Sequence, residues 1–226
     1  GGAGPAERVE RALDAFGSIA RAAGLDLRHV VFVNPYLTKA VPADTMNKAY
    51  ARRFEFGNTP ARATISVDGL PEGDVVFTGV AVRDLRDRKA IRPRNMPPSP
   101  TASPCVLARD TLFCSAKSGF IPGPHLGIYA ATVQHQVRQT MRNLLDGLEE
   151  ADMGLGDAVA ANVYLEDIAQ FASMNEIYAQ YLGDTPPART TVQPTVSDPG
   201  GREPDEKGRY PALEEISIVA VRPVKP

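Results

Sequence analysis

The chain has 226 residues, of which 43% are hydrophobic and 23% are charged, and its net charge is −2. This composition excludes a disordered or fibrous chain, and the near-neutral charge argues against binding to nucleic acid. Two cysteines and three scattered histidines make no disulfide framework and no metal motif. No apolar run approaches the roughly 20 residues of a membrane span, and the residues from Gly1 to Pro5 do not resemble a secretory signal. We therefore expect a cytoplasmic protein that binds no membrane.

The hydrophobic pattern predicts two similar series of helices and strands. The first series comprises a helix with apolar residues at Val9, Leu13, Phe16 and Ala20, a strand at 30–34, a helix at 44–54, and strands at 62–67 and 74–82. The second comprises strands at 104–108 and 111–116, a helix with Val137, Met141, Leu144 and Leu148, a strand at 158–164, a helix at 171–182, and strands at 189–192 and 214–221. The complete series reads β-β-α-β-α-β-β, an α+β arrangement with helices on one face of a sheet.

The two series are copies of one unit. Tyr36 matches Tyr164 and Asn47 matches Asn175, each 128 positions later, and Pro60-Ala61-Arg62 recurs as Pro187-Ala188-Arg189. Matches of this kind that keep register over about thirty residues indicate a duplication. We divide the chain into a first copy at 1–83 that lacks the leading strands, a linker at 84–103 and a complete second copy at 104–226.

Two irregular stretches punctuate these copies. The linker is rich in proline and arginine, which fits either an anionic-ligand patch or, as we prefer, an extended solvated connector. The second stretch, Ser197 to Pro211, has no long counterpart in the first copy, which favours a functional or disordered loop. We expect this loop to fold over the cleft that contains Arg189.

Three motifs carry a family resemblance. They are Thr59-Pro60-Ala61-Arg62, Pro186-Pro187-Ala188-Arg189 and Ser118-Gly119-Phe120-Ile121-Pro122. Together they resemble the RidA (YjgF) family, whose members are also called L-PSP endoribonucleases. The resemblance implies chorismate-mutase-like units that assemble as a homotrimer or larger homo-oligomer, with clefts between subunits. It also implies hydrolysis of reactive enamines and imines, without metal or bound cofactor.

The resemblance assigns roles to particular residues. The arginine of the Pro-Ala-Arg motif would bind the substrate carboxylate, here Arg189 and, in the first copy, Arg62, because a guanidinium matches a carboxylate bidentately. The family's helical asparagine corresponds to Asn175 and Asn47. The segment Ser118-Gly119 would supply a hydroxyl and backbone donors. Because only the second copy has this segment, we expect it to hold the better-formed site.

Several positions depart from the family pattern. Cys105 replaces an aromatic residue, and Phe120 replaces a glutamine in the substrate-binding loop. Ser217, and Thr78 in the first copy, stand where deaminating members carry a glutamate that handles water. Glu215 lies two residues before Ser217 on the same strand face, about 6.6 Å away. Glu215 is therefore a weaker candidate for the catalytic residue that handles water.

Each assignment has a structural alternative. Arg189 fits a salt-bridge role, and Asn175 and Asn47 fit local backbone bonding. Cys105 is either a nucleophile or a buried inert thiol. At the level of function, the sequence favours a deaminase acting on a small carboxylate, with a non-catalytic small-acid binder and an endoribonuclease as alternatives.

Overall fold

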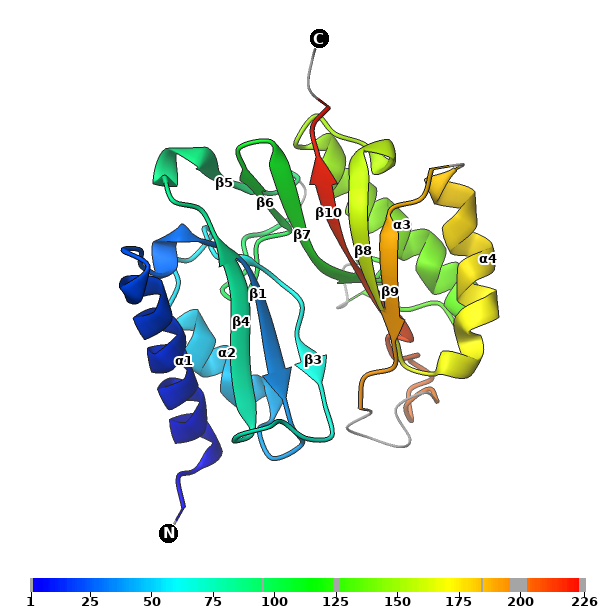
Figure 1. The fold of residues 1–226 in the computed structure, drawn as a ribbon. Helices are drawn as coiled ribbons and strands as arrows, with labels where there is room; N and C mark the ends of the chain where they lie inside the picture. Colours follow the sequence, from blue (N-terminus) through cyan, green and yellow to red (C-terminus); the bar gives the residue numbers. More distant parts are fainter. Residues whose placement is uncertain (1, 95, 124–126, 184, 196–202, 224–226) are drawn as a thin grey trace. The chain divides into compact units, whose positions relative to one another are not determined.

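The structure is a computed structural model that describes residues 2–94, 96–123, 127–183, 185–195 and 203–223. The chain folds into two compact units, unit 1 (Gly1–Ser115) and unit 2 (Ala116–Pro226). Each unit combines helices with strands (Figure 1), which confirms the α+β class. Among the described residues, no helix is both long and apolar enough to cross a membrane.

Unit 1 is built around one central strand, β1 (Val30–Leu37). β4 (Val75–Ala81) pairs with β1 antiparallel, while the short strands β2 (Ala61–Arg62) and β3 (Ile65–Ser66) pair with it in parallel. The remaining elements are α1 (Pro5–Ala22), η1 (Leu27–His29), α2 (Ala43–Ala51), η2 (Leu85–Asp87), β5 (Arg88–Ile91), β6 (Cys105–Ala108) and the first five residues of β7 (Thr111–Ser118).

The core of unit 1 forms where α1 and α2 cover this sheet. Val9 and Leu13 on α1 are fully buried, as the helical spacing predicted, and they pack with Tyr50 of α2. Phe16 lies beside Phe77 of β4, with ring centroids 6.3 Å apart. The apolar stripe of α1 therefore anchors it to the sheet.

Unit 2 repeats this plan. Its sheet follows the order β7, β10 (Glu214–Val221), β8 (Ala158–Leu165) and β9 (Ala188–Val192), with the end of β7 at one edge. The helices α3 (Val133–Glu149) and α4 (Phe171–Leu182) lie on one face of this sheet (Figure 1). Two short turns, η3 (Leu155–Asp157) and η4 (Ile168–Gln170), precede β8 and α4.

The strand register shows that the units are copies of one another. Asn34 on β1 faces Thr78 on β4, and the matching Asn162 on β8 faces Ser217 on β10. Both pairings are antiparallel, and in both units a parallel strand bearing the Pro-Ala-Arg arginine flanks the same central strand. Ser217 and Thr78 are thus equivalent positions, as the sequence alignment predicted.

The linker differs from the expectation of an extended solvated connector. Residues 85–91 form η2 and β5, and β5 pairs antiparallel with β6. Arg88 donates from Nε to the carbonyl of Val30 at 2.9 Å and from Nη2 to the carbonyl of Asn58 at 2.8 Å. These bonds hold this part of the segment to unit 1. The expected loop at 197–211 lies partly outside the described residues, which resume at Glu203.

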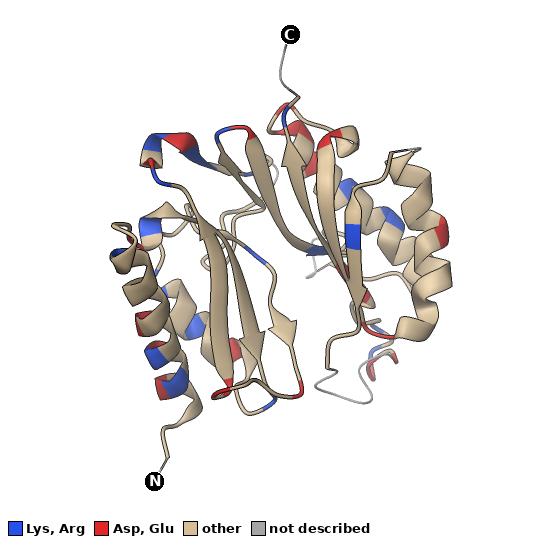
Figure 2. Cartoon of the chain, in the orientation of Figure 1, with Lys and Arg blue, Asp and Glu red and all other residues tan. Residues whose placement is uncertain are grey.

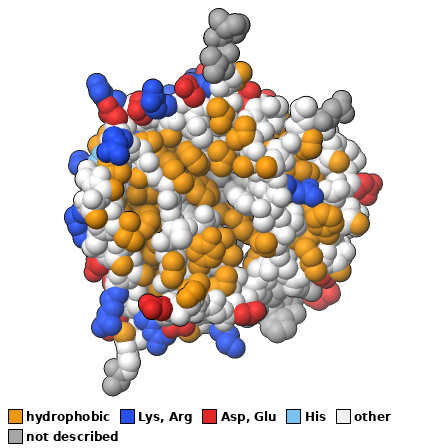
Figure 3. Space-filling model, in the orientation of Figure 1, with side chains coloured by type: hydrophobic (Ala, Val, Ile, Leu, Met, Phe, Trp, Pro, Cys, Tyr) orange, Lys and Arg blue, Asp and Glu red, His pale blue; other side chains and the backbone are white. Residues whose placement is uncertain are grey.

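Charged side chains and hydrophobic side chains occupy different parts of the surface. Lys, Arg, Asp and Glu lie mainly on helices, turns and strand ends (Figure 2), whereas hydrophobic side chains gather over the strands of unit 1 in the same view (Figure 3). Val80 on β4 is 44% exposed, and on unit 2 Val159 of β8 and Val192 of β9 are 48% and 40% exposed. Single exposed apolar residues of this kind are common on protein surfaces.

Candidate functional site

Arg189 is held by three residues of α4. Its Nη1 donates a hydrogen bond of 2.8 Å to Oδ1 of Asn175. Its guanidinium carbon lies 5.3 Å from the ring centroid of Phe171 and 4.6 Å from that of Tyr178. Positions 171, 175 and 178 share one helix face, so α4 presents an amide and two aromatic rings to a single side chain. The structure thus places the two predicted residues Arg189 and Asn175 together.

This arrangement orients the guanidinium without neutralising it. Stacking on aromatic rings attracts the cation through the ring faces, and the amide oxygen is an uncharged acceptor. The guanidinium carries five N–H donors, and the bond to Asn175 uses one of them. The remaining donors can bind a carboxylate through two parallel hydrogen bonds. Burial raises the pKa of Tyr178, so its hydroxyl stays neutral beside the cation.

The segment Ser118–Phe120 is fixed against α3. Nδ2 of Asn143 donates to the carbonyl oxygens of Ser118 and Phe120, each at 3.0 Å. A Cβ at Gly119 would lie 2.6 Å from the Cα and the carbonyl oxygen of Gln136, so only glycine permits this approach. The hydroxyl of Ser118 lies 2.9 Å from that of Tyr129. The predicted loop is therefore rigid, and its hydroxyl already has a partner.

Ionisable groups that are not among the predicted site residues lie near this loop. Burial lowers the pKa of Lys117 to about 8, against the opposing effect of the nearby Glu215 carboxylate. Burial also raises the pKa of Tyr129. Glu214 is fully buried and accepts a hydrogen bond from Thr140, and burial raises its pKa to about 8. Lys117 lies in the strand that ends at the Ser118-Gly119 segment, and a lysine at such a position could have been predicted as a functional residue.

The two groups of predicted residues are far apart within unit 2. Ser118 ends β7 and Arg189 lies on β9, with β10 and β8 between these strands. Three steps between neighbouring strands amount to about 14 Å. One small substrate therefore cannot touch both groups within a single copy of unit 2.

Known proteins match the second part of the chain. The sequence profile described as Endoribonuclease L-PSP matches residues 96–200. A RutC family protein from Pyrococcus horikoshii is 39% identical over 93 residues, which cover 40% of this chain and 71% of that protein. The mitochondrial protein mmf2 of Schizosaccharomyces pombe is 39% identical over 92 residues, or 38% of this chain and 67% of that protein. The chain belongs to the RutC (RidA/YjgF/L-PSP) family.

A solved structure matches the whole chain. The crystal structure of a chorismatase superposes with a TM-score of 0.72 at 17% identity, covering 98% of this chain and 72% of that one. At this identity the match establishes the fold alone. The match extends over both units of the chain.

The counterpart of the Arg189 site in unit 1 differs in its contacts. The guanidinium of Arg62 lies over the ring of Tyr50, 5.0 Å from its centroid, and its Nη1 is 3.8 Å from Sδ of Met46. Oδ1 of Asn47 is buried and has no hydrogen-bond partner among the described residues. The arginine–asparagine bond that defines the unit 2 site is therefore not repeated in unit 1.

The structure corrects the expectation for Cys105. Its sulfur is bonded to that of Cys114, which faces it across β6 and β7. A disulfide sulfur carries no thiol proton and forms no thiolate, so Cys105 is not a nucleophile in this state. Pairing of the two strands brings these cysteines together, and the sequence analysis did not consider that pairing.

Proposed function

We propose that this RutC-family chain is a hydrolase for a small, reactive enamine or imine that carries a carboxylate. The observation that supports this proposal is the Arg189 site, where Asn175 and two rings hold a guanidinium with donors to spare. Such a fork binds a planar carboxylate through two parallel hydrogen bonds. The carboxylate would then fix the position of the adjacent reactive carbon.

The reaction needs one proton and one water. A proton adds to the terminal carbon of the enamine, water adds to the resulting iminium carbon, and ammonia leaves as the carbonyl forms. An acid with a pKa near the working pH suits such a transfer, and Lys117, with its pKa of about 8, meets this condition. Glu215, close enough to Lys117 to affect its pKa, is the candidate for orienting water, since Ser217 stands at the family's glutamate position.

These groups require two copies of the chain. Because Arg189 and the Ser118 loop are separated within one unit 2, we propose that Arg189 of one copy faces Lys117 and Ser118 of another. A homotrimer would create such clefts.

A complementation experiment tests this arrangement. Arg189→Ala and Lys117→Met should each abolish ammonia release from freshly generated 2-aminoacrylate. Mixing the two variants under conditions that exchange subunits should restore about a quarter of the parent's activity, the share of clefts that receive both intact residues. A mixture that stays inactive despite exchange contradicts the shared site, and a parent that releases no ammonia contradicts the deaminase.

The full-length match to a chorismatase favours a second candidate reaction. Chorismate carries an enol ether beside a carboxylate, and its hydrolysis follows the same course, with an alcohol leaving in place of ammonia. The matching test is release of pyruvate from chorismate by the parent and by Arg189→Ala. Activity on chorismate without activity on 2-aminoacrylate would favour this candidate. Carboxylate binding without either activity would favour the non-catalytic alternative, and cleavage of RNA would favour the ribonuclease.

A further inference from the structure

The amine of Lys117 has an unusual position for a lysine. Lys117 is the residue before the last of β7, and its side chain is only partly exposed. Its Nζ makes no hydrogen bond and no ion pair with any residue that the structure describes. By contrast, the exposed Lys48 on α2 forms an ion pair of 2.7 Å with Asp44. Lys117 is therefore an amine that no acceptor holds in its charged form.

Other polar groups gather around this amine. Glu215 on β10, the neighbouring strand, lies close enough to affect the pKa of both Lys117 and Tyr129. The hydroxyl of Tyr129 lies 2.9 Å from that of Ser118. Because Glu214 bonds to Thr140 of α3, the alternation of the strand directs Glu215 to the opposite face of the sheet. The amine thus belongs to a polar cluster outside the core that α3 covers.

This amine is partly neutral at physiological pH. Burial lowers the pKa of Lys117 from 10.5 to about 8, although the negative charge of Glu215 acts in the opposite direction. At pH 7 about a tenth of the amine is then neutral, against about one part in three thousand for an ordinary lysine. Only the neutral amine adds to a carbonyl or iminium carbon.

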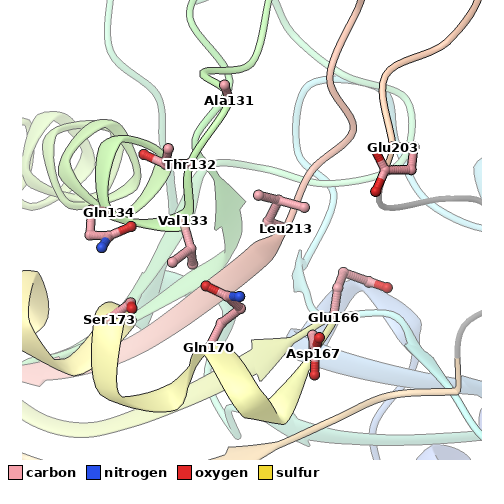
Figure 4. A pocket seen from close by; sticks show the side chains of 10 residues that line it. All are labelled: Ala131, Thr132, Val133, Gln134, Glu166, Asp167, Gln170, Ser173, Glu203 and Leu213. Carbon is pink, nitrogen blue, oxygen red and sulfur yellow. The ribbon is translucent and has the colours of Figure 1, made fainter.

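The cavity of unit 2 does not offer this chemistry. It has a volume of about 400 Å³ and lies where the first turns of α3 and α4 approach the segment before β10 (Figure 4). The described residues that line it supply hydroxyl, amide and carboxyl groups, among them those of Thr132, Gln170 and Ser173, but no lysine or cysteine. A covalent bond to a carbonyl carbon needs an amine or a thiol of the kind that Lys117 provides.

We propose that Lys117 is a nucleophile that forms a Schiff base with the substrate carbon bearing the amino group. This inference rests on the proposed hydrolase function. In that function the Lys117 ammonium gives its proton to the terminal carbon of the enamine, which leaves a neutral amine beside an electrophilic iminium carbon. An amine fixed on a strand next to this carbon has an entropic advantage over water.

The steps balance without any oxidant. Nζ of Lys117 bonds to the iminium carbon, one proton passes from Nζ to the substrate nitrogen, and ammonia leaves as the lone pair of Nζ completes the Schiff base. Water then adds to the same carbon, and its two protons pass to Nζ as the bond between carbon and Nζ breaks. The keto acid leaves and the Lys117 ammonium is restored. Enamine and water still give keto acid and ammonia.

Reductive trapping tests the covalent bond directly. The parent is incubated with pyruvate and sodium cyanoborohydride, which reduces a Schiff base to a stable secondary amine, and the labelled lysines are located by peptide mass spectrometry. Lys117 should react at least about tenfold faster than the exposed Lys48, because more of its amine is neutral. Ammonia release from 2-aminoacrylate should fall in proportion to the labelled fraction of Lys117. Labelling of Lys117 no faster than Lys48 overturns the proposal.

A substitution that keeps the charge separates nucleophile from cation. Lys117→Arg stays positively charged but forms no Schiff base. It should remain unlabelled at position 117 and release ammonia at least about a hundredfold more slowly than the parent, with folding checked by circular dichroism. The matched control, Lys48→Arg, should release ammonia at the parent's rate. Parent-like ammonia release by Lys117→Arg overturns the proposal.

The same measurements separate the Schiff base from the hydrolase. A parent that releases ammonia while Lys117 stays unlabelled overturns the Schiff base and keeps the hydrolase, in which water adds directly. A parent that is labelled at Lys117 but releases no ammonia keeps the Schiff base and overturns the hydrolase. Arg189→Ala should need about tenfold more pyruvate for the same labelling rate, as expected for losing a charged hydrogen-bonding group. An unchanged dependence on pyruvate would overturn the pairing of Lys117 with Arg189.

Discussion

Replacing Arg189 by alanine tests the carboxylate site at its centre. The guanidinium makes one hydrogen bond to Asn175 and contacts two rings. If it also binds the substrate carboxylate, its removal deletes a charge-assisted hydrogen bond worth about 1.5–3 kcal/mol. That loss corresponds to an affinity about 10- to 150-fold weaker.

Two further substitutions separate charge from geometry. Arg189→Lys keeps the charge but loses the planar fork and most of the stacking on Phe171 and Tyr178, so it should recover little of the affinity. Asn175→Ala leaves the guanidinium in place but removes the acceptor that orients it. We expect a loss of about 1 kcal/mol, or roughly fivefold, because the rings still hold the arginine.

The assay is titration calorimetry with pyruvate, a stable keto-acid product, together with the melting temperature of each variant. Arg142→Ala serves as the control, since this arginine is exposed on α3. The reasoning fails if Arg189→Ala binds pyruvate like the parent while its melting temperature falls by several degrees. That result would make Arg189 a structural residue of the β9–α4 contact.

The remaining predictions concern residues around the loop and the disulfide. Gly119→Ala should lower the melting temperature and reduce activity, because its Cβ meets the backbone of Gln136; unchanged values would contradict this packing. Burial raises the pKa of Glu214 in the folded state from 4.5 to about 8, so folding favours its protonated form and the parent loses stability as pH rises through this interval. Glu214→Gln should therefore gain stability relative to the parent between pH 5 and pH 8, which denaturant titration measures, and parallel curves would refute the shift. Replacing both Cys105 and Cys114 by serine should cost about 2–3 kcal/mol, as expected for so short a loop, and should leave turnover intact; lost turnover with intact folding would restore a chemical role for Cys105.

The sequence predicted long, periodic elements well. The helix expected at 171–182 and the strand at 214–221 have the same bounds in the structure, and the apolar face of α3 is buried as its spacing indicated. In each case the apolar face of the element packs on the core, and the same apolar residues produce the hydrophobic period in the sequence. The duplication was equally accessible, because it rests on identities rather than on contacts.

Features that depend on pairing between distant segments were missed. The strand expected at 62–67 is divided into β2 and β3, which pair with β1 at Ala61–Arg62 and at Ile65–Ser66. Likewise β5 exists because β6 offers it a partner, although its composition indicated a connector. The disulfide was missed although it is local: the two-residue turn between the strands predicted at 104–108 and 111–116 sets Cys105 opposite Cys114.

The candidate site was predictable in part. The Pro-Ala-Arg motif pointed to Arg189, and the family's helical asparagine pointed to Asn175. Both residues could therefore be named without a structure. Their separation from Ser118 depends on the strand order, in which β10 and β8 come between β7 and β9. Strand order is a property of the whole sheet, and the proposal of a site shared between two copies depends on it.

One position near the arginine differs between the two copies. Asn175 and Tyr178 have counterparts 128 positions earlier, in Asn47 and Tyr50, but Phe171 corresponds to Ala43. The arginine of unit 1 lies over the ring of Tyr50, and its Nη1 is near a methionine sulfur. In unit 2 the second ring, on the same helix face as Asn175, confines the guanidinium to the position where the amide oxygen accepts its hydrogen bond. The repeat thus preserves the motif in both copies, while the phenylalanine at the start of α4 adds a ring contact to the arginine of the second copy, which supports the choice of that copy for the proposed carboxylate site.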